Sequence, residues 1–446
     1  MKKYIIACMA LLCVLSASAD YTPSAEVQKS RKEFQDDKFG IFLHWGIYSV
    51  LGRGEWVMYN DKLNYLEYPK VAGAFNPVNF DAEAWVKAFK AAGAKYITFT
   101  TRHHDGFSMW DSEASDYNIV KKTPYGKDVV KQLADACHKY DIKLQLYYSH
   151  MDWQRPDYPF GKHPNVEGRP TNQQDYNHYF EFMNAQLKEL LTKYGSVRAL
   201  WFDGYWDHNQ DAKPFDWRLS EQYKLIHDLQ PACMIGNNHH TTPFDGEDYQ
   251  LFERDLPGDN TAGMSGGQGV TTRLPLETCQ TMNNTWGYST TDHNYKSTAT
   301  LIQLLVKAAG KNANLLLNIG PKPDGTLPDE ALSRLKDMGD WLSANGETIY
   351  GTRGGVIDSS KIQNDGQNPN PNWVSTTKGD KVYVHVLTAG MQSVTLPYAL
   401  SQIKAARMFD GGAAVNLTAG AGKHVVLALP TASSGVDTII ELTMNP

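Results

Sequence analysis

The stretch VRALWFDG, residues 197–204, lies between two amphipathic helical patterns at 173–194 and 217–229. Side chains alternate along a strand, so Leu200 and Phe202 share one face while Trp201 and Asp203 share the other. The purely apolar pair suits a face that is covered by helices. We therefore predict a buried strand over 197–203 that directs Trp201 and Asp203 toward the inside of the fold.

The same strand-and-helix unit repeats before and after this stretch. Alternation of this kind favours a parallel sheet, and eight units over about 320 residues favour a (β/α)8 barrel. The segment GDNTAGMSGGQG at 258–269 is typical of a loop where one barrel helix is expected, so the barrel should be irregular. The predicted strands are 40–44, 95–100, 142–147, 197–203, 233–237, 248–253, 277–282 and 314–319, and the predicted helices are 81–92, 127–140, 173–194, 217–229, 295–309 and 330–345.

After residue 350 the pattern changes to short β-like runs separated by Gly, Pro, Asn and Asp. The runs are 373–377, 381–387, 393–397, 406–409, 425–429 and 438–443. Such spacing is typical of a small antiparallel sandwich. We therefore predict an α/β chain with a TIM-like barrel over 20–350 and a C-terminal β-sandwich over 351–446.

Residues 1–19 have the pattern of a cleavable signal peptide. Lys2 and Lys3 precede a short apolar run, and Ala17-Ser18-Ala19 is a small-x-small cleavage site. No other stretch approaches 18 apolar residues, so we expect no membrane insertion and an exported protein, periplasmic or secreted. Net charge is −6, and losing two Lys with the signal would make it −8. That balance disfavours a nucleic-acid partner, which usually needs a basic surface.

Metal and disulfide chemistry are both disfavoured by the sequence. Cys137, Cys233 and Cys279 are widely spaced, so they indicate core positions rather than a disulfide framework. No HxH, HExxH or CxxC pattern occurs, and the adjacent His103 and His104 would point to opposite faces of a strand. We therefore expect no catalytic metal.

Polar and aromatic residues follow several predicted strands, where a barrel of this kind carries its active site. His44 follows the first strand, His103 and His104 the second, Tyr147 the third and Asp203 the fourth. Each has an ordinary structural interpretation, and Asp203-Gly204 alone would suggest only a turn. Their accumulation at one rim favours an enzyme.

Several of these motifs together resemble the α-L-fucosidases of glycoside hydrolase family twenty-nine. The resemblance runs from about residue 30 to 350, in the order of the family. It is carried by KFGIFLHWGIYSV at 38–50, GEW at 54–56, RHHDGF at 102–107, LYYS at 146–149, LWFDG at 200–204, NLLLNIGP at 314–321 and Asp324-Gly325.

The resemblance implies a retaining exo-α-L-fucosidase that removes terminal α-L-fucose from fucosylated glycans by double displacement, with two carboxylates and no cofactor. The nucleophile of the family maps onto Asp203, which would carry the covalent fucosyl intermediate. The implied fucose-binding positions are His44, Glu55, Trp56, His103, His104, Tyr147 and Trp201.

The acid/base has two candidates. Glu253 ends the sixth predicted strand in DYQLFERDLPG, which resembles the acid/base segment of several members. Glu277 lies in the more recognisable LETCQTMNNTWGY, but it starts its strand and should face the other end of the barrel. We favour Glu253 and keep Glu277 as the runner-up.

The chemistry of a retaining glycosidase makes electrostatic demands on this pair. Hydrogen bonds and nearby histidines should hold Asp203 ionised, whereas burial and the opposing carboxylate should raise the pKa of Glu253. Alternatives are a secreted fucose-binding protein without activity, a glycosidase for a related sugar such as galactose, and a metal-dependent barrel hydrolase. Linkage preference and oligomeric state are left open.

Overall fold

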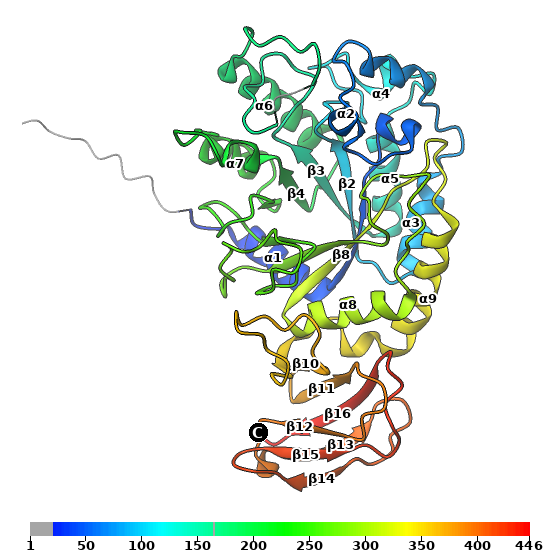
Figure 1. The fold of residues 1–446 in the computed structure, drawn as a ribbon, viewed down its shortest axis with the longest axis vertical. Helices are drawn as coiled ribbons and strands as arrows, with labels where there is room; N and C mark the ends of the chain where they lie inside the picture. Colours follow the sequence, from blue (N-terminus) through cyan, green and yellow to red (C-terminus); the bar gives the residue numbers. More distant parts are fainter. Residues whose placement is uncertain (1–20, 164–165) are drawn as a thin grey trace, which may run out of the picture.

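The computed structural model describes residues 21–163 and 166–446, so the predicted signal peptide at 1–19 lies outside the described residues. All eight predicted barrel strands are present in one parallel sheet, which confirms the irregular (β/α)8-like barrel (Figure 1). They are β1 (Phe39–Leu43), β2 (Tyr96–Arg102), β3 (Lys143–Ser149), β4 (Ala199–Asp203), β5 (Met234–Asn237), β6 (Gln250–Glu253), β7 (Leu276–Thr281) and β8 (Ala313–Ile319).

The six predicted helices also form and cover the outside of the barrel. Side-chain caps mark where two of them begin. The Asp81 side chain accepts a hydrogen bond from the Ala84 amide at the start of the helix over 82–91, and the Ser297 side chain accepts one from the Thr300 amide at the start of the helix over 298–310. The helices are α3 (Ala82–Ala91), α5 (Val129–Tyr140), α6 (Tyr176–Lys193), α7 (Leu219–Leu229), α8 (Thr298–Gly310) and α9 (Asp329–Asn345).

Further elements complete the barrel and were not predicted. Helix α1 (Ala25–Asp37) precedes β1, and Phe34 on it contacts Tyr96 and Tyr249 inside the barrel. The segment 258–269 between β6 and β7 is a loop, as predicted. The short helices are α2 (Val57–Asn60) and α4 (Ile119–Lys122), with 3-10 turns η1 (Ile47–Leu51), η2 (Tyr68–Ala74), η3 (Tyr205–His208) and η4 (Gly346–Thr348).

Strands β5 and β6 are the two edges of the sheet, and Asp248 joins them. Its backbone amide donates to the carbonyl of Ile235 at 2.7 Å, and its side chain accepts from the Ile235 amide at 2.9 Å. The carboxylate thus replaces a backbone acceptor of the missing ladder, and Arg31 pairs with its other oxygen at 2.6 Å. This contact nearly closes the barrel without a continuous β5–β6 ladder.

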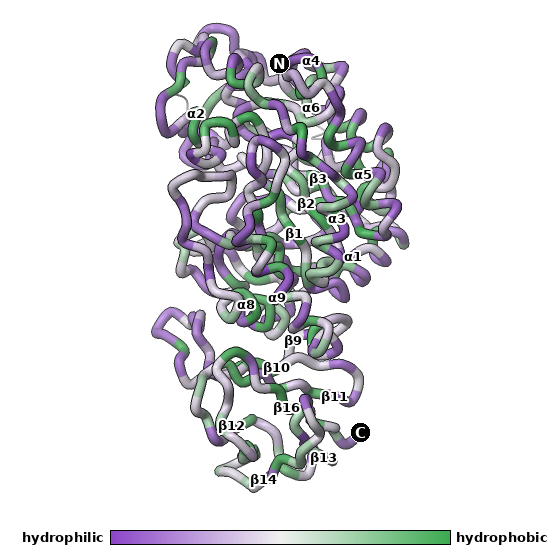
Figure 2. Tube along the Cα trace, turned by 90° about the vertical axis from the view of Figure 1, so that its right-hand side faces the viewer, coloured by the Kyte–Doolittle hydropathy of each residue, from purple (hydrophilic) through white to green (hydrophobic). Residues whose placement is uncertain are grey.

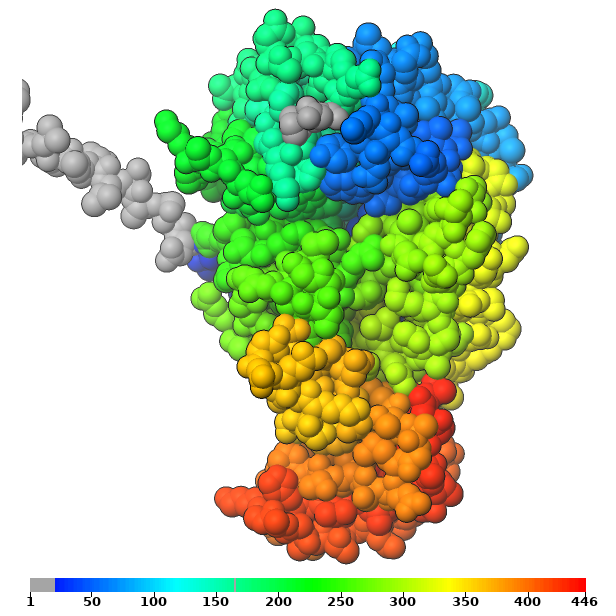
Figure 3. All heavy atoms as spheres, viewed as in Figure 1, coloured from blue at the N-terminus to red at the C-terminus, as the bar shows by residue number. Residues whose placement is uncertain are grey.

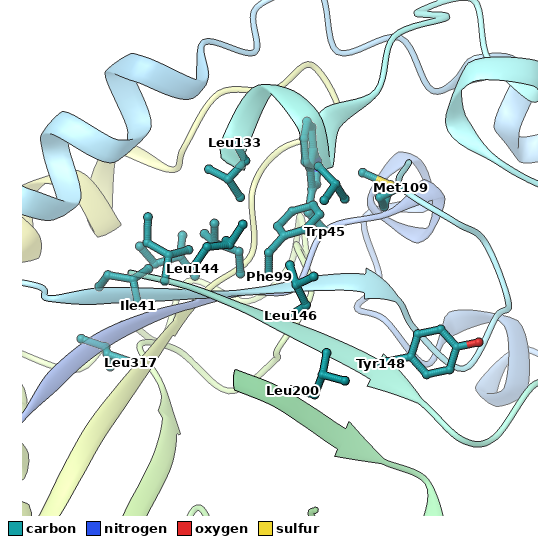
Figure 4. Packing of buried hydrophobic residues seen from close by; sticks show 14 of the residues in the cluster. Ile41, Trp45, Phe99, Met109, Leu133, Leu144, Leu146, Tyr148, Leu200 and Leu317 are labelled. Carbon is teal, nitrogen blue, oxygen red and sulfur yellow. The ribbon is translucent and has the colours of Figure 1, made fainter. Parts of the chain in front are cut away.

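The alternation predicted for 197–203 is confirmed, because Leu200 and Phe202 pack under the helices and Trp201 packs inside the barrel. Ile41, Leu144, Leu146 and Leu200 join the core under the helices, together with Leu133 of α5 (Figure 4). Hydrophobic residues accordingly concentrate along the barrel strands and α8, while hydrophilic residues follow the outer loops (Figure 2). Inside the barrel, a second cluster contains Phe42, Tyr147, Trp201, Tyr249, Cys279 and Leu316.

The C-terminal residues form the predicted antiparallel sandwich, seen as a lobe at one end of the molecule (Figure 3). All six predicted runs are strands, and two further strands, β9 and β14, were not predicted. One sheet has the order β13-β16-β11-β10-β9 and the other β12-β15-β14. The strands are β9 (Arg353–Ile357), β10 (Trp373–Lys378), β11 (Lys381–Val386), β12 (Ser393–Leu396), β13 (Ile403–Met408), β14 (Asn416–Ala419), β15 (Val425–Ala428) and β16 (Thr438–Met444), with the turn η5 (Leu400–Gln402) before β13.

The sandwich packs against helix α8 of the barrel. The Gln303 side-chain amide donates to the carbonyls of Leu387, Gly435 and Val436 at 2.9, 2.8 and 3.2 Å. Val374 of β10 is buried in the barrel core rather than in the core of the sandwich. The two parts therefore share a packed interface on the outer side of the barrel.

Candidate active site

A cavity of about 790 Å³ opens at the carboxyl ends of the barrel strands. It receives side chains from the ends of β1, β2, β3, β4 and β6 and from the loops that follow them. The predicted residues on its wall are His44, Glu55, Trp56, His103, His104, Tyr147, Trp201, Asp203 and Glu253. The cavity is also lined by Trp206, Asn238, His240, Arg254 and Trp286, which sequence reasoning did not single out.

Asp203 is the last residue of β4, and four donors hold its carboxylate. Tyr147 donates to Oδ2 at 2.9 Å, while the Gly204 amide, the Trp206 indole and the Asn238 amide donate to Oδ1 at 2.8, 2.9 and 3.3 Å. Gly204 has a φ of +90°, which turns the chain directly after the strand and places Trp206 beneath the carboxylate. Oδ2 therefore keeps more free accepting capacity than Oδ1.

Glu253 is the last residue of β6, and its Oε2 faces two donors. The Asn238 amide donates at 2.8 Å, and His240 Nε2 lies at 3.1 Å. Because the same Asn238 nitrogen reaches Asp203 Oδ1 at 3.3 Å, the two bridged oxygens lie within about 6 Å of each other. The two carboxyl groups are thus adjacent across one cavity.

The pKa shifts of this pair are the reverse of the sequence-based expectation. Burial, and then the Glu253 charge, raise the pKa of Asp203 to about 6. Burial also acts to raise the pKa of Glu253, but the hydrogen bond and charge of His240 outweigh it and lower that pKa below its usual value. The expectation overlooked His240, which contacts Glu253 directly and acts on the pKa of Asp203 only through its charge.

Glu277 lies inside the barrel and does not line the cavity. It is fully buried at the second position of β7 and accepts hydrogen bonds from Tyr96 at 2.6 Å and from the Trp201 indole at 3.1 Å. Burial raises its pKa to about 7 despite both bonds. Glu277 therefore reaches the cavity only through Trp201, whose indole ring it holds by the hydrogen bond to Nε1.

Three histidines at the base of the cavity are neutral. Burial lowers the pKa of His44 to about 3 and those of His103 and His104 well below the usual value. His44 Nδ1 lies 2.7 Å from Asn318 Oδ1, which fixes the proton on Nδ1 and leaves a lone pair on Nε2. His104 Nδ1 similarly lies 2.7 Å from Ser149 Oγ, whose own proton goes to the Met151 carbonyl.

Indole rings and one further carboxyl form the upper wall. Trp56 stacks on Trp206 with ring centroids 5.8 Å apart, and Trp286 lies 5.2 Å from His44. Glu55 is buried and accepts the Gly287 amide at 2.7 Å, while burial raises its pKa. Flat apolar faces beside hydrogen-bonding groups are suited to a sugar ring, which has both kinds of surface.

The residues that sequence reasoning missed had an available signal. Asn238 and His240 follow the end of β5, so the strand-end rule that found His44 and Asp203 applies to them as well. Trp206 and Trp286 lie in loops, where no periodicity places a side chain.

Across residues 21–163 and 166–446, no group of three or more His, Cys, Asp or Glu side chains is arranged to hold a metal ion.

A barrel with paired carboxylates in an aromatic cavity is typical of glycoside hydrolases. The family model for α-L-fucosidase matches residues 8–347 of this chain. The chain therefore belongs to the α-L-fucosidase family, glycoside hydrolase family 29, and is an enzyme of that kind.

Individual relatives agree with this assignment. The structure of α-L-fucosidase isoenzyme 1 from Paenibacillus thiaminolyticus has a TM-score of 0.80 and 35% identity, covering 94% of this chain and 100% of that one. The Thermotoga maritima α-fucosidase structure has a TM-score of 0.72 and 26% identity, covering 94% and 98%. Plasma α-L-fucosidase of Homo sapiens is 27% identical over 452 residues, 94% of this chain and 90% of that protein.

Proposed function

We propose that this enzyme is a retaining exo-α-L-fucosidase that removes terminal α-L-fucose from fucosylated oligosaccharides through a covalent fucosyl–Asp203 intermediate. The observation that carries the proposal is the Asn238 bridge between Asp203 and Glu253, which keeps the bridged oxygens within about 6 Å. Carboxyl groups about 5–5.5 Å apart are typical of retention, and about 6.5–9.5 Å of inversion.

The hydrogen bonds assign a role to each carboxylate oxygen. Three donors hold Asp203 Oδ1 in place, so Oδ2, with one donor, is the oxygen that attacks the anomeric carbon. The bond to the leaving oxygen breaks as that oxygen takes a proton from Glu253. In the second step Glu253 accepts a proton from water, whose oxygen displaces Asp203 and releases fucose.

The walls of the cavity suit the rest of the sugar. The lone pair on Nε2 of neutral His44 accepts a hydrogen bond from a sugar hydroxyl. His104 Nε2 lies 3.6 Å from Asp203 Oδ2, close enough for one hydroxyl to contact both. Trp56, Trp201 and Trp286 provide the apolar surface for the ring and its methyl group. A galactose-type substrate carries a hydroxymethyl group at that position instead.

Single substitutions test the two catalytic roles. Asp203→Ala should reduce hydrolysis of an aryl α-L-fucoside by about 10⁴-fold or more, because no other group is placed to form the covalent bond. Glu253→Ala should slow a disaccharide far more than an activated aryl fucoside, because nitrophenolate leaves without a proton. Circular dichroism and thermal melting would establish that each variant is folded.

Four outcomes would each contradict a part of this function. Near-normal turnover by Asp203→Ala would exclude Asp203 as the nucleophile. Leaving-group sensitivity in Glu277→Ala but not in Glu253→Ala would assign the acid/base role to Glu277 instead of Glu253. Binding of fucose without nitrophenol release by the native protein would favour the fucose-binding alternative. Faster hydrolysis of the corresponding galactoside would show that the preferred substrate carries a galactose-type sugar rather than fucose.

Export is part of the proposal and rests on the sequence of residues 1–19. Among residues 21–163 and 166–446, no helix combines the length and apolar character needed to cross a membrane. N-terminal sequencing of the protein recovered from the native host should begin at Asp20. A mature chain that still starts at Met1 would exclude cleavage.

A further inference from the structure

His240 is the one histidine of the cavity that contacts the proposed acid/base directly. It lies in the loop after β5, and its Nε2 is 3.1 Å from Glu253 Oε2. Its backbone has a φ of +61°, a strained conformation for a residue with a side chain. Such strain persists only where the surroundings impose it, and here it directs the imidazole at Glu253.

The charged groups around His240 are mostly acidic. Glu253 on β6, Asp203 on β4 and Asp255 in the loop after β6 all favour its protonated form, and together they outweigh burial, so its pKa is raised. Arg254 is the nearby cation, and it stacks over Trp286 while donating to the Asn284 carbonyl. The His240 side chain keeps 19% of its surface exposed, so it can exchange protons with water.

We propose that His240 is a positioning residue for the acid/base, an inference that rests on the role proposed for Glu253. The His240–Glu253 pair shares one mobile proton, which has two possible positions. In the first arrangement a charged imidazole lies beside ionised Glu253. In the second a neutral imidazole lies beside Glu253 that is protonated at Oε1. Nε2–H donates to Oε2 in both, so Glu253 keeps its orientation. The mobile proton moves between His240 Nδ1 and Glu253 Oε1 through solvent.

The proton balance of the cycle follows from this arrangement. The leaving oxygen takes the proton from Glu253 Oε1, and the pair is then without its mobile proton. The attacking water returns one proton to Oε1 as its oxygen bonds to the sugar, which restores the pair. No proton is gained or lost over one turnover, and Asp203 never carries one.

The pair also widens the pH range of catalysis. Two coupled sites that share one proton lose it at a higher pH than either site would alone. His240 therefore moves the basic limb of the pH profile upward for substrates whose leaving group needs a proton. Its charge also favours ionised Asp203, which moves the acidic limb downward.

His240→Gln separates charge from hydrogen bonding, because the Gln amide donates at the position of Nε2 but does not titrate. For a disaccharide substrate we expect the basic limb of kcat/KM to move to lower pH by about one unit or more. For an activated aryl fucoside the acidic limb should move up while the maximal rate changes little. His178→Gln is the matched control. His178 lies on α6, outside the cavity, and its Nδ1 is 2.7 Å from Asp157 Oδ2. This substitution should leave both limbs of the pH profile in place.

His240→Asn guards against misfolding, because Asn tolerates left-handed backbone better than Gln and should narrow the profile in the same way. Limbs that stay in place in both variants would overturn the proposal, as would an equal shift in His178→Gln. Loss of rate at every pH without movement of a limb would indicate a purely structural role and would overturn it as well. Failure of Glu253→Ala to show leaving-group sensitivity is a separate result that contradicts the proposed function itself.

Discussion

At the scale of single residues, the proposed chemistry depends on how Asp203 is kept both buried and reactive. Burial opposes its ionised form, whereas the hydrogen bonds of Trp206 and Tyr147 favour it. The balance leaves the pKa of Asp203 at about 6, so the carboxylate is ionised at neutral pH but remains a stronger base than an exposed aspartate.

This balance predicts an acidic limb near pH 6 in kcat/KM for an activated aryl fucoside. Below that pH, Asp203 is protonated and does not attack, so the rate falls about tenfold per unit. Tyr147→Phe removes the 2.9 Å hydrogen bond to Oδ2, which should raise the pKa of Asp203 and move the limb to higher pH. A limb that moves to lower pH in Tyr147→Phe would contradict this account.

At the scale of elements, the ends of the strands could be predicted and the loops between them could not. Alternation along 197–203 predicted that Trp201 and Asp203 lie inside the barrel, because every second residue of a strand faces the same side and the apolar residues there mark the helix-covered side. Trp206 reaches Asp203 only through the turn at Gly204 and the 3-10 turn η3, which no periodicity specifies. Asn238 and His240 follow the end of β5, so the strand-end rule predicts them as site residues as well.

Gly204→Ala tests the turn after β4. A Cβ at this position would lie 2.8 Å from the Met151 amide nitrogen, and the φ of +90° adds strain, so we expect a stability loss of about 1–3 kcal/mol. Displacement of Asp203 should lower kcat by about 10²-fold.

Gly366→Ala is the control for this change, because Gly366 has a φ of +83° but open space around it. It should cost some stability in a melting curve without altering kcat. Full activity in Gly204→Ala would contradict a role for the turn in placing Asp203.

At the scale of the whole molecule, the composition and order of units indicated a barrel followed by a sandwich, and both formed. What they did not indicate is how the parts join. The backbone amide and the carboxylate of Asp248 join the β5–β6 seam, and the interface to the sandwich includes Gln303 and Val374. Such contacts connect residues far apart in the chain, so they leave no local pattern.

Val374→Ala tests whether the two parts unfold together. Val374 is 1% exposed in the barrel core, so its truncation should cost about 2 kcal/mol and lower the Tm of a single calorimetric transition. Val394→Ala, in the core of the sandwich, should lower the same transition. Two separate transitions, with each variant affecting only one, would contradict a shared cooperative unit.

The most direct test is covalent trapping with a 2-fluoro-fucosyl fluoride, followed by peptide mapping of the inactivated enzyme by mass spectrometry. The fluorine at C2 slows both steps, but the good fluoride leaving group keeps attachment of the sugar faster than its release, so the intermediate accumulates. We predict one added deoxyfluoro sugar per chain, on the peptide that contains Trp201, Phe202 and Asp203, with fragment ions that place it on Asp203. A label on another carboxylate, or an unlabelled enzyme that still turns over substrate, would contradict the account.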